Sequence, residues 1–574
     1  MRKWVKSGTA TTISEVIERN TGIPLNEFIS PPQTYSITNL EAAAEVVRNA
    51  ISSATPITIY GDYDADGITA SSILYLMLAH LLGPEKKSIV SVVLPRRFSE
   101  GYGISTKRLD YINEGLLITV DNGISAVDEI RYAKEKGLQV IILDHHMPRE
   151  DGVLPCADVI VDPHAIAGSD FDGYCGAGLA YKLAELLITD VHLLNHLVGL
   201  AAIGTVADVM PLVKDNRNIV IRGLSNMNSG RNCVGLACLL KTLNLRYIDE
   251  TSIGFSIGPV INAAGRLFDD GAERVFKVLT GSERYAELNA NELVEINESR
   301  KLIVEAGLET CTQIISNDCL YGENPLVIYT TKEDGESFHE GIVGILAGKL
   351  AEKYEVPTFV LCETEDGILK GSARSDGTVD LKALLDSVAE HIYKYGGHAG
   401  AAGLSVKKEK ISDFIDALHT KIAEFPCSAD NEDALYYDLE IAASDVPQVI
   451  EELRKFAPFG EGNPQIVFKI GTSRTTARGG KFYQFLGKDM KTLKLFFNGF
   501  DAIGFGMADI YTAIGSPMAL EMVGTLAKKT FGEYAPITVC QVELRDFVKS
   551  KEVRPPNKLS SSIAAKMQAA GMKK

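Results

Sequence analysis

The stretch TIYGDYDADGITASS, residues 58–72, places Asp62, Asp64 and Asp66 directly after an apolar run. Carboxylates this close repel one another unless a cation neutralises them, so the stretch predicts a metal site. The alternative is an aspartate-rich turn that only caps the helix after it. An EF-hand calcium loop is excluded, because its twelfth position requires a glutamate and is Ile73 when counted from Asp62.

The composition is that of a soluble chain with several domains. The 574 residues are 45% hydrophobic, and their net charge of -17 argues against coating of duplex DNA by bulk charge. Nine cysteines without a C-x-x-C pair are typical of reduced thiols in a cytosol. No signal peptide is evident, and the apolar run at residues 198–210 is interrupted by Asp208 and too short to cross a bilayer. We therefore expect a cytoplasmic protein without a membrane span.

The pattern along the chain predicts an α/β fold. Residues 45–215 alternate short apolar β-like runs with amphipathic helical segments, which is typical of a parallel sheet. Residues 283–318 are charged and helix-prone, and predict a long connecting helix. A second α/β unit follows at 325–425, and a mostly β segment at 430–547.

Acids and histidines follow four apolar runs of the first segment. These residues are Asp62, Asp64 and Asp66, then Asp121, then Asp144, His145 and His146, and finally Asp208. The run before Asp208 can also be read as a helix, in which case this aspartate caps it, and the DHH triplet alone can be a turn. Because the carboxyl ends of parallel strands lie at one edge of a sheet, we expect these side chains to converge. Carboxylates with one or two imidazoles suit Mn²⁺ or Mg²⁺ better than structural Zn²⁺.

The same residues resemble a known family. The motifs of the DHH phosphoesterase superfamily are matched by DYDADG (62–67), VDNG (120–123), DHH (144–146) and GTVADVMPL (204–212). The chain further resembles the RecJ family, bacterial 5′ exonucleases specific for single strands, through RRFSEGYGIS (96–105), IGPVINAAGR (257–266), FHEGIVGILAGKL (338–350), GSARS (371–375), GGHAGAAG (396–403) and FAPFGEGNP (456–464). This resemblance spans residues 45–545 in order, and the last motif favours RecJ because small DHH phosphatases lack the third domain.

The resemblance implies a division of the chain. We expect an N-terminal segment at 1–45, a DHH catalytic domain at 46–282, a connecting helix at 283–320, a DHHA1-type substrate-binding domain at 321–428, a β-barrel OB-like single-strand-binding domain at 429–547 and a mobile basic tail at 548–574.

The resemblance also implies two catalytic divalent ions, Mn²⁺ or Mg²⁺. One would be held by Asp62, Asp64 and Asp121, and the other by Asp66, Asp121, His145 and Asp208, with Asp121 bridging. Two ions that share a carboxylate can activate a water and stabilise the leaving oxygen of a phosphodiester. His146 is expected to face the phosphate, and Asp144 to orient the two histidines.

Three glycine-rich motifs resemble the phosphate-binding elements of the family. They contain Arg266, then Ser372 with Arg374, and then His398, and Arg97 is a further candidate. Glycine lets backbone amides approach an anion, and arginine binds a phosphate through two hydrogen bonds. Without the resemblance, GGHAGAAG reads as a tight turn with close helix packing, and an isolated arginine as a surface charge.

Residues 471–500 are locally basic in an acidic chain. Arg474, Arg478 and Lys481 lie among interleaved aromatic residues, as on OB-folds that bind single strands. The alternative is that most of these aromatics form the core of a small β-barrel, with the basic residues on its solvated face.

We expect a metal-dependent exonuclease that degrades single-stranded DNA 5′→3′ to nucleoside 5′-monophosphates in DNA repair and recombination; the polarity and the DNA preference come from the resemblance. One alternative is a DHH phosphodiesterase of short oligonucleotides or cyclic dinucleotides, and another is a non-catalytic replication-scaffold relative, which would lose the acidic residues that this chain keeps. A helicase and single-strand binding protein are expected partners of a monomer.

Overall fold

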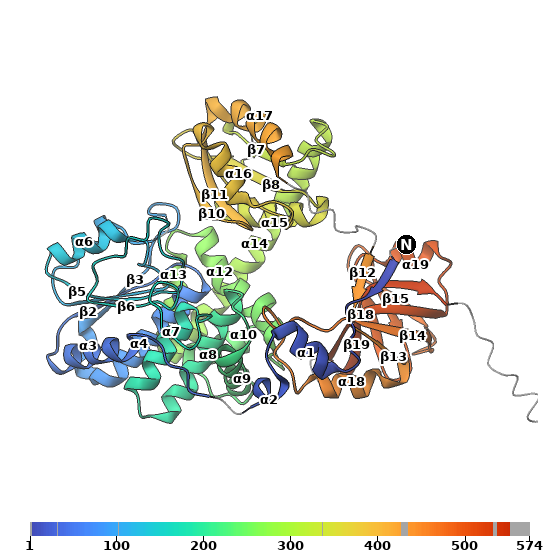
Figure 1. Cartoon of the computed structure of the whole chain (residues 1–574), viewed down its shortest axis with the longest axis horizontal. Coiled ribbons are helices and arrows are strands. Elements are labelled where there is room, and N and C mark those ends of the chain that lie inside the picture. Colours follow the sequence, from blue (N-terminus) through green and yellow to red (C-terminus); the bar gives the residue numbers. More distant parts are fainter. Residues whose placement is uncertain are drawn as a thin grey trace, which may run out of the picture. The chain divides into compact units, whose positions relative to one another are not determined.

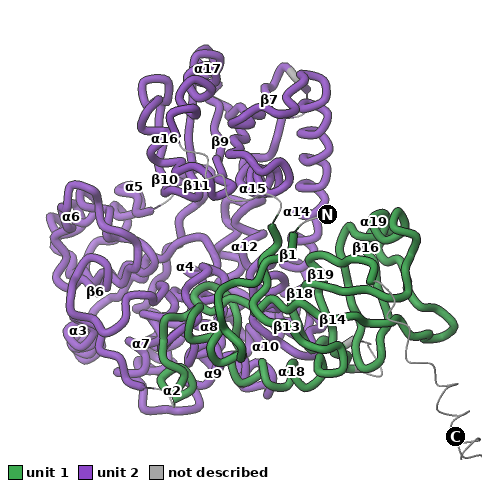
Figure 2. Tube along the Cα trace, turned by 45° about the vertical axis from the view of Figure 1, so that its right-hand side comes forward, with its two compact units in different colours: residues 1–31, 433–574 green, residues 32–432 purple. Residues whose placement is uncertain are grey.

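The computed structural model describes residues 3–30, 33–101, 103–335, 337–425, 434–531 and 537–550. They form two compact units (Figure 2). Unit 1 contains residues 1–31 and 433–574, and unit 2 contains residues 32–432. From residue 551 on, the predicted basic tail lies outside the described residues, and its first residues belong to a strand that ends at Lys549.

Unit 2 begins with a five-stranded parallel sheet (Figure 1). Its strands follow the order β3-β2-β4-β5-β6. Its strands are β2 (Ile57–Tyr60), β3 (Val90–Val93), β4 (Leu116–Val120), β5 (Gln139–Leu143) and β6 (Val159–Val161). One face packs on α3 (Leu40–Ser52), α4 (Ala65–Lys86) and α7 (Gly176–Leu187), and the other on α6 (Val127–Glu135). Burial on both faces explains why the strands are continuous apolar runs, and the parallel sheet expected from the sequence is confirmed.

A helical part completes this half of unit 2. It contains α8 (Val191–Ala207), α9 (Lys214–Asn228), α10 (Val234–Thr242), α12 (Gly258–Leu267) and α13 (Gly271–Thr280). The apolar run before Asp208 is therefore helical, and it is apolar all round because α4, α7 and α9 pack around it. The stretch Ala65–Ile89 is long and apolar enough to cross a membrane, but 67% of its most apolar window is buried inside the unit, as in a core helix.

A single long helix, α14 (Glu283–Asn317), leads to the second sheet of unit 2. This sheet has the order β10-β11-β9-β8-β7, in which only β7 and β8 are parallel. Its strands are β7 (Leu326–Thr330), β8 (Thr358–Glu363), β9 (Ile368–Arg374), β10 (Lys394–His398) and β11 (Ala401–Lys407). One face packs on α14 and α15 (Val343–Tyr354), and the other on α16 (Leu381–Ser387) and α17 (Ile411–Lys421).

Unit 1 contains a seven-stranded mixed sheet, in the order β13-β14-β18-β19-β17-β16-β15. The strands are β13 (Leu439–Ile441), β14 (Phe468–Arg474), β15 (Tyr483–Leu486), β16 (Thr492–Phe496), β17 (Asp501–Gly504), β18 (Ala519–Phe531) and β19 (Ile537–Lys549). This largely antiparallel sheet fits the OB-like domain that the sequence predicts.

The first thirty residues belong to unit 1. Strand β1 (Lys3–Lys6) pairs in parallel with β12 (Ala434–Tyr437). Trp4 donates a hydrogen bond from Nε1 to Asp546 (2.8 Å), and Arg19 forms an ion pair with the largely buried Asp438. The predicted N-terminal segment 1–45 is thus shared between the units, because α3 packs in the core of unit 2. We propose the other domain boundaries as they are predicted from the sequence.

We predict that Asp438 stabilises unit 1. Besides pairing with Arg19, its carboxylate accepts the backbone N–H of Val467 (2.8 Å). Asp438→Ala removes the ion pair with Arg19 and leaves the buried N–H of Val467 without its acceptor, which should lower the free energy of unfolding by about 2 kcal/mol. Trp4 is the only tryptophan of the chain, so its fluorescence during urea unfolding reports on unit 1.

The matched control is Glu440→Ala, which removes an exposed ion pair with Lys469 (3.1 Å). We expect this change to cost about 0.5 kcal/mol or less. Equal losses in the two variants would contradict a structural role for Asp438.

Candidate metal centre

The loop after β2 brings three carboxylates to the sheet edge. Asp64 caps α4, because its Oδ1 accepts the N–H of Gly67 (3.0 Å). Asp62 is only 3% exposed, and its Oδ1 has no hydrogen-bond partner among the described residues. A capping turn therefore accounts for one aspartate, whereas a buried carboxylate oxygen without a donor requires a cation or a bound water.

Asp66 is held by the start of another helix. Its Oδ2 accepts the N–H of Gly176 (2.6 Å) and its Oδ1 that of Ala177 (2.9 Å), at the positive end of α7. Helix α8 also packs closely against this carboxylate. Its Gly204 has no room for a side chain, because a Cβ there would lie 2.4 Å from Oδ1 of Asp66. Two helices distant in sequence thus fix the orientation of this carboxylate.

Asp121 follows β4 in a left-handed backbone conformation, with φ 62°. Its N–H donates to the carbonyl of Leu143 (3.0 Å), which ties it to the end of β5. A non-glycine residue in this region costs roughly 1–2 kcal/mol, and aspartate and asparagine tolerate it best. The turn buries the carboxylate against His145, with 3.1 Å between Oδ1 and Nε2.

Asp144 contacts both histidines, which the resemblance implies it orients. Its Oδ1 accepts the backbone N–H groups of His145 (2.8 Å) and His146 (3.3 Å) and lies 2.8 Å from Nδ1 of His146. Its Oδ2 accepts the N–H of Ile124 (2.9 Å). Burial opposes its charge, but the hydrogen bond and charge of His146 outweigh burial and lower the pKa of Asp144. The same bond raises the pKa of His146 to about 9 although burial acts against it.

The four segments converge on one cluster. Nε2 of His145 lies 3.5 Å from Asp208 and 3.8 Å from Asp66, in addition to its contact with Asp121. Three groups have ligand atoms within 4.8 Å of one another: Asp62, Asp64 and Asp121; Asp66, His145 and Asp208; and Asp121, His145 and His146. The first contains the residues of the first expected ligand set. The second contains those of the other set except Asp121, and the third brings His146 closer to the cluster than the sequence indicates.

The carboxylates of the cluster need a nearby positive charge to remain ionised together. Burial, followed by repulsion from neighbouring carboxylates, raises the pKa of Asp62, Asp64 and Asp121. The same causes raise the pKa of Asp208 to about 8. Oxygen donors with one or two imidazoles match the coordination of Mn²⁺ and Mg²⁺. The residues present therefore fit a pair of divalent cations.

A cluster of arginines lies beside the carboxylates. Burial and then repulsion from Arg97, Arg300 and Arg374 lower the pKa of Arg266 to about 10. Arg97 lies over the ring of Tyr63 (5.1 Å to the centroid), in the same loop as the first aspartates. Four guanidinium groups gathered in this way indicate a site for an anion.

The second sheet carries the other residues that are predicted to contact phosphate. Arg374 donates from Nη1 to Ser372 Oγ (2.6 Å) and to the carbonyl of Ala373 (2.8 Å), so its guanidinium is held in place. Ala401 pairs with Arg374 on one side and with His398 on the other, which places these residues in one row across three strands. His398 is exposed.

The predicted single-strand surface of unit 1 divides into two kinds of residue. Arg474 and Lys481 are exposed. Arg478 is exposed as well, and it pairs with the buried Asp501 (2.8 Å) and lies over the ring of Phe496 (5.0 Å). Three of the interleaved aromatic residues are buried in the core, as the alternative interpretation of this segment expects: Phe496, Phe497 and Phe500. Phe482 and Tyr483 remain 38% and 37% exposed.

Sequence reasoning missed the residues that hold or extend these sites. Gly176 and Ala177 start a helix far from Asp66 in the sequence, and only the fold brings them together. Arg300 lies in the middle of α14, outside any glycine-rich motif, and its buried Nε has no hydrogen-bond partner among the described residues.

Comparisons with known proteins agree with this geometry. Family models match for the DHH family N-terminal domain at residues 56–205, the DHHA1 domain at 323–424 and the RecJ OB domain at 437–543. The single-stranded-DNA-specific exonuclease RecJ of Haemophilus influenzae is 33% identical over 468 residues, which cover 77% of this chain and 79% of that protein.

RecJ of Thermus thermophilus is 30% identical over 531 residues, which cover 91% of this chain and 74% of that protein. A crystal structure of Thermus thermophilus RecJ in complex with Mn²⁺ matches with a TM-score of 0.74 at 26% identity, and covers 94% of this chain and 76% of that chain. These relatives and the ordered DHH, DHHA1 and RecJ OB domains show that the chain belongs to the RecJ family of single-stranded-DNA-specific exonucleases.

Proposed function

We propose that this chain is a metal-dependent exonuclease that degrades single-stranded DNA from the 5′ end and releases nucleoside 5′-monophosphates. The observation that carries the proposal is the convergence of carboxylates and histidines from four separate segments, next to a cluster of arginines. The acidic residues are all present, which disfavours a non-catalytic scaffold relative. The RecJ OB match disfavours an enzyme for short oligonucleotides or cyclic dinucleotides, because a small substrate needs no such domain.

Two divalent ions would complete the site. We assign one to Asp62, Asp64 and Asp121 and the other to Asp66, Asp121, His145 and Asp208. When bound, such ions supply Lewis-acid stabilisation of the phosphate and a nucleophilic water at neutral pH. Asp121 would be shared by the two ions, while Gly176 and Ala177 hold Asp66 and Asp144 holds the backbone of His145.

The chain's own residues position the strand. His146 lies beside the cluster with its Nδ1 2.8 Å from Asp144, and we expect its ring to face a phosphate oxygen. Arg97, Arg266 and Arg374, with Ser372 and His398, would bind the terminal phosphate or the adjacent backbone. Exposed Arg474, Arg478 and Lys481 would bind phosphates further along the strand, and Arg478 also pairs with the buried Asp501.

The cellular setting follows from the resemblance. We propose a cytoplasmic monomer that acts in DNA repair and recombination, together with a helicase that unwinds duplex and a single-strand binding protein. A single-stranded substrate in the cell has to be produced by such unwinding, which is the physical reason to expect a helicase.

The proposed activity is tested with single-stranded DNA and RNA labelled at either end and incubated with Mn²⁺, Mg²⁺ or chelator. A 5′-labelled DNA should release labelled mononucleotide at once, and a 3′-labelled DNA should shorten gradually. Immediate release of the 3′ label would contradict the polarity, and digestion in chelator would contradict the need for a metal.

We predict that Asp121→Asn abolishes hydrolysis without unfolding the chain. Asparagine tolerates the left-handed backbone at this position and removes the charge that two ions would share. Mn²⁺ should raise the melting temperature of the wild type, because it binds only the folded state, and should do so much less for the variant. Near-normal activity with an unchanged Mn²⁺ effect would rule out the bridging role.

We predict that Arg374→Ala weakens binding of a 5′-phosphorylated oligonucleotide by about 1–3 kcal/mol, the contribution of a charge-assisted hydrogen bond. Arg374→Lys should recover only part of this loss, because it lacks the planar fork. Arg131→Ala is the control, since Arg131 lies on the surface and pairs with Asp128. If Arg374→Ala binds like the control, Arg374 is an ordinary structural arginine.

We predict that the double change Arg474→Ala and Lys481→Ala flattens the salt dependence of binding to long single strands. Each lost phosphate contact should reduce the slope by about 0.7, or about 1.4 for both. Binding of a trinucleotide should change little, because it carries too few phosphates to contact both the metal centre and the pair Arg474 and Lys481. An unchanged slope on long strands would mean that the strand does not follow these residues.

A further inference from the structure

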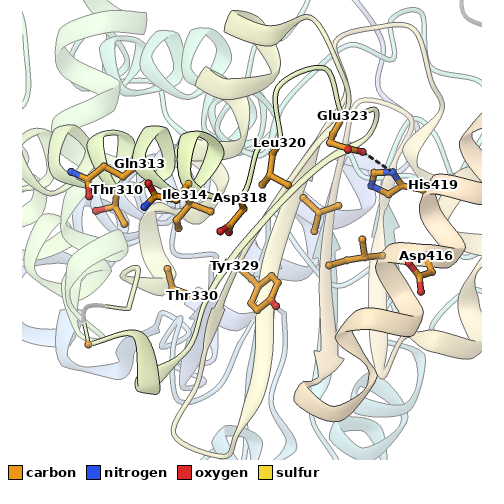
Figure 3. A pocket seen from close by; sticks show the side chains of 14 residues that line it. Thr310, Gln313, Ile314, Asp318, Leu320, Glu323, Tyr329, Thr330, Asp416 and His419 are labelled. Carbon is orange, nitrogen blue, oxygen red and sulfur yellow. Dashed lines mark ion pairs between the residues drawn. The ribbon is translucent and has the colours of Figure 1, made fainter.

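A groove of about 1010 Å³ lies in unit 2, away from the residues assigned to the metal centre and the arginine cluster. Figure 3 shows its two helical walls, with Thr310 and Gln313 of α14 on one side and Asp416 and His419 of α17 on the other. Tyr329 of β7 lies between the walls. The groove thus runs along the outer edge of the second sheet, where β7 is the last strand in the described part of the chain.

The backbone of β7 faces this groove. The N–H of Leu326 donates to the carbonyl of Pro357 beside β8 (2.9 Å), so the backbone groups of Leu326 and Ile328 point inward to the sheet. Successive residues of a strand alternate, and the backbone groups of Val327 and Tyr329 therefore point outward. The lining includes both outward residues, Val327 and Tyr329, together with Thr330, whose backbone groups point inward by the same alternation.

The charge of the groove selects its occupant. Among the fourteen lining residues are Asp318, Glu323 and Asp416, and none is lysine or arginine. Glu323 pairs with His419 (3.1 Å), whereas Asp318 and Asp416 are exposed on the two walls. A strand placed on β7 would lie between these two carboxylates, so basic side chains on it would be favoured.

We propose that this groove docks an extended basic segment of a partner protein, which adds a sixth strand to the sheet at β7. Five residues of β7 offer room for about five residues of peptide at roughly 3.3 Å per residue. A second copy of the chain is disfavoured, because two acidic grooves would face each other. The site is independent of the exonuclease centre, so this proposal can fail while the proposed function stands.

The first test is binding of a fluorescein-labelled hexapeptide of alternating lysine and valine, followed by fluorescence anisotropy. The full chain should bind it in a salt-sensitive way, and should bind the glutamate–valine counterpart at least tenfold more weakly. The double variant Asp318→Lys and Asp416→Lys should lose at least tenfold in affinity for the basic peptide. Asp413→Lys is the control, because Asp413 is exposed on α17 outside the groove. Equal losses in both variants would overturn the proposal.

The second test is hydrogen exchange of the β7 amides. The outward amides of Val327 and Tyr329 should exchange more slowly when the basic peptide is bound, while those of Leu326 and Ile328, which already face β8, should not change. Binding without this protection would exclude strand addition.

Other occupants would also appear in these experiments. The chain's residues 551–574 are basic in sequence, so tighter peptide binding by a chain that lacks them would assign the groove to the protein's own tail. A dimer that dissociates in the double variant would assign it to a second copy. Either result would overturn docking of a partner.

Discussion

Mutual repulsion among buried carboxylates is the constraint on which the catalytic half of the structure depends. Asp62, Asp66 and Asp121 are nearly inaccessible to solvent, and burial together with their neighbours raises the pKa of Asp62 and Asp121. Such a cluster persists only if rigid elements hold each side chain. The parallel sheet brings the loops to one edge, the start of α7 holds Asp66, and the left-handed turn fixes Asp121.

The arginine cluster is the electrostatic counterpart of the carboxylates. Arg266 is destabilised as a cation by burial and by three other arginines, just as the carboxylates are destabilised as anions. The loop that carries the aspartates also carries Tyr63, on which Arg97 lies. Divalent ions would neutralise the carboxylates, and the phosphates of a nucleic-acid strand would neutralise the arginines. A metal-bound polynucleotide would therefore reduce the repulsion within both clusters. This complementarity explains why two costly clusters lie side by side.

The sequence predicts those parts of the molecule that depend on local pattern. The apolar strands, the acids at their ends and the long helix α14 follow from hydrophobic periods and residue types, and the parallel sheet follows from their alternation. Contacts between distant segments could not be predicted in this way. They include the pairing of β1 with β12, the neutralisation of Asp501 by Arg478 and the place of Arg300 beside Arg266. The run before Asp208 shows the limit of pattern alone, since a buried helix and a buried strand are equally apolar.

Four chain segments build one cluster that would hold two divalent ions, with Asp121 shared between them. The most direct measurement is anomalous diffraction at the manganese absorption edge from crystals of this chain grown with Mn²⁺. We expect two strong peaks, one among Asp62, Asp64 and Asp121 and the other among Asp66, Asp121, His145 and Asp208. A single peak, or peaks outside these residues, would contradict this assignment.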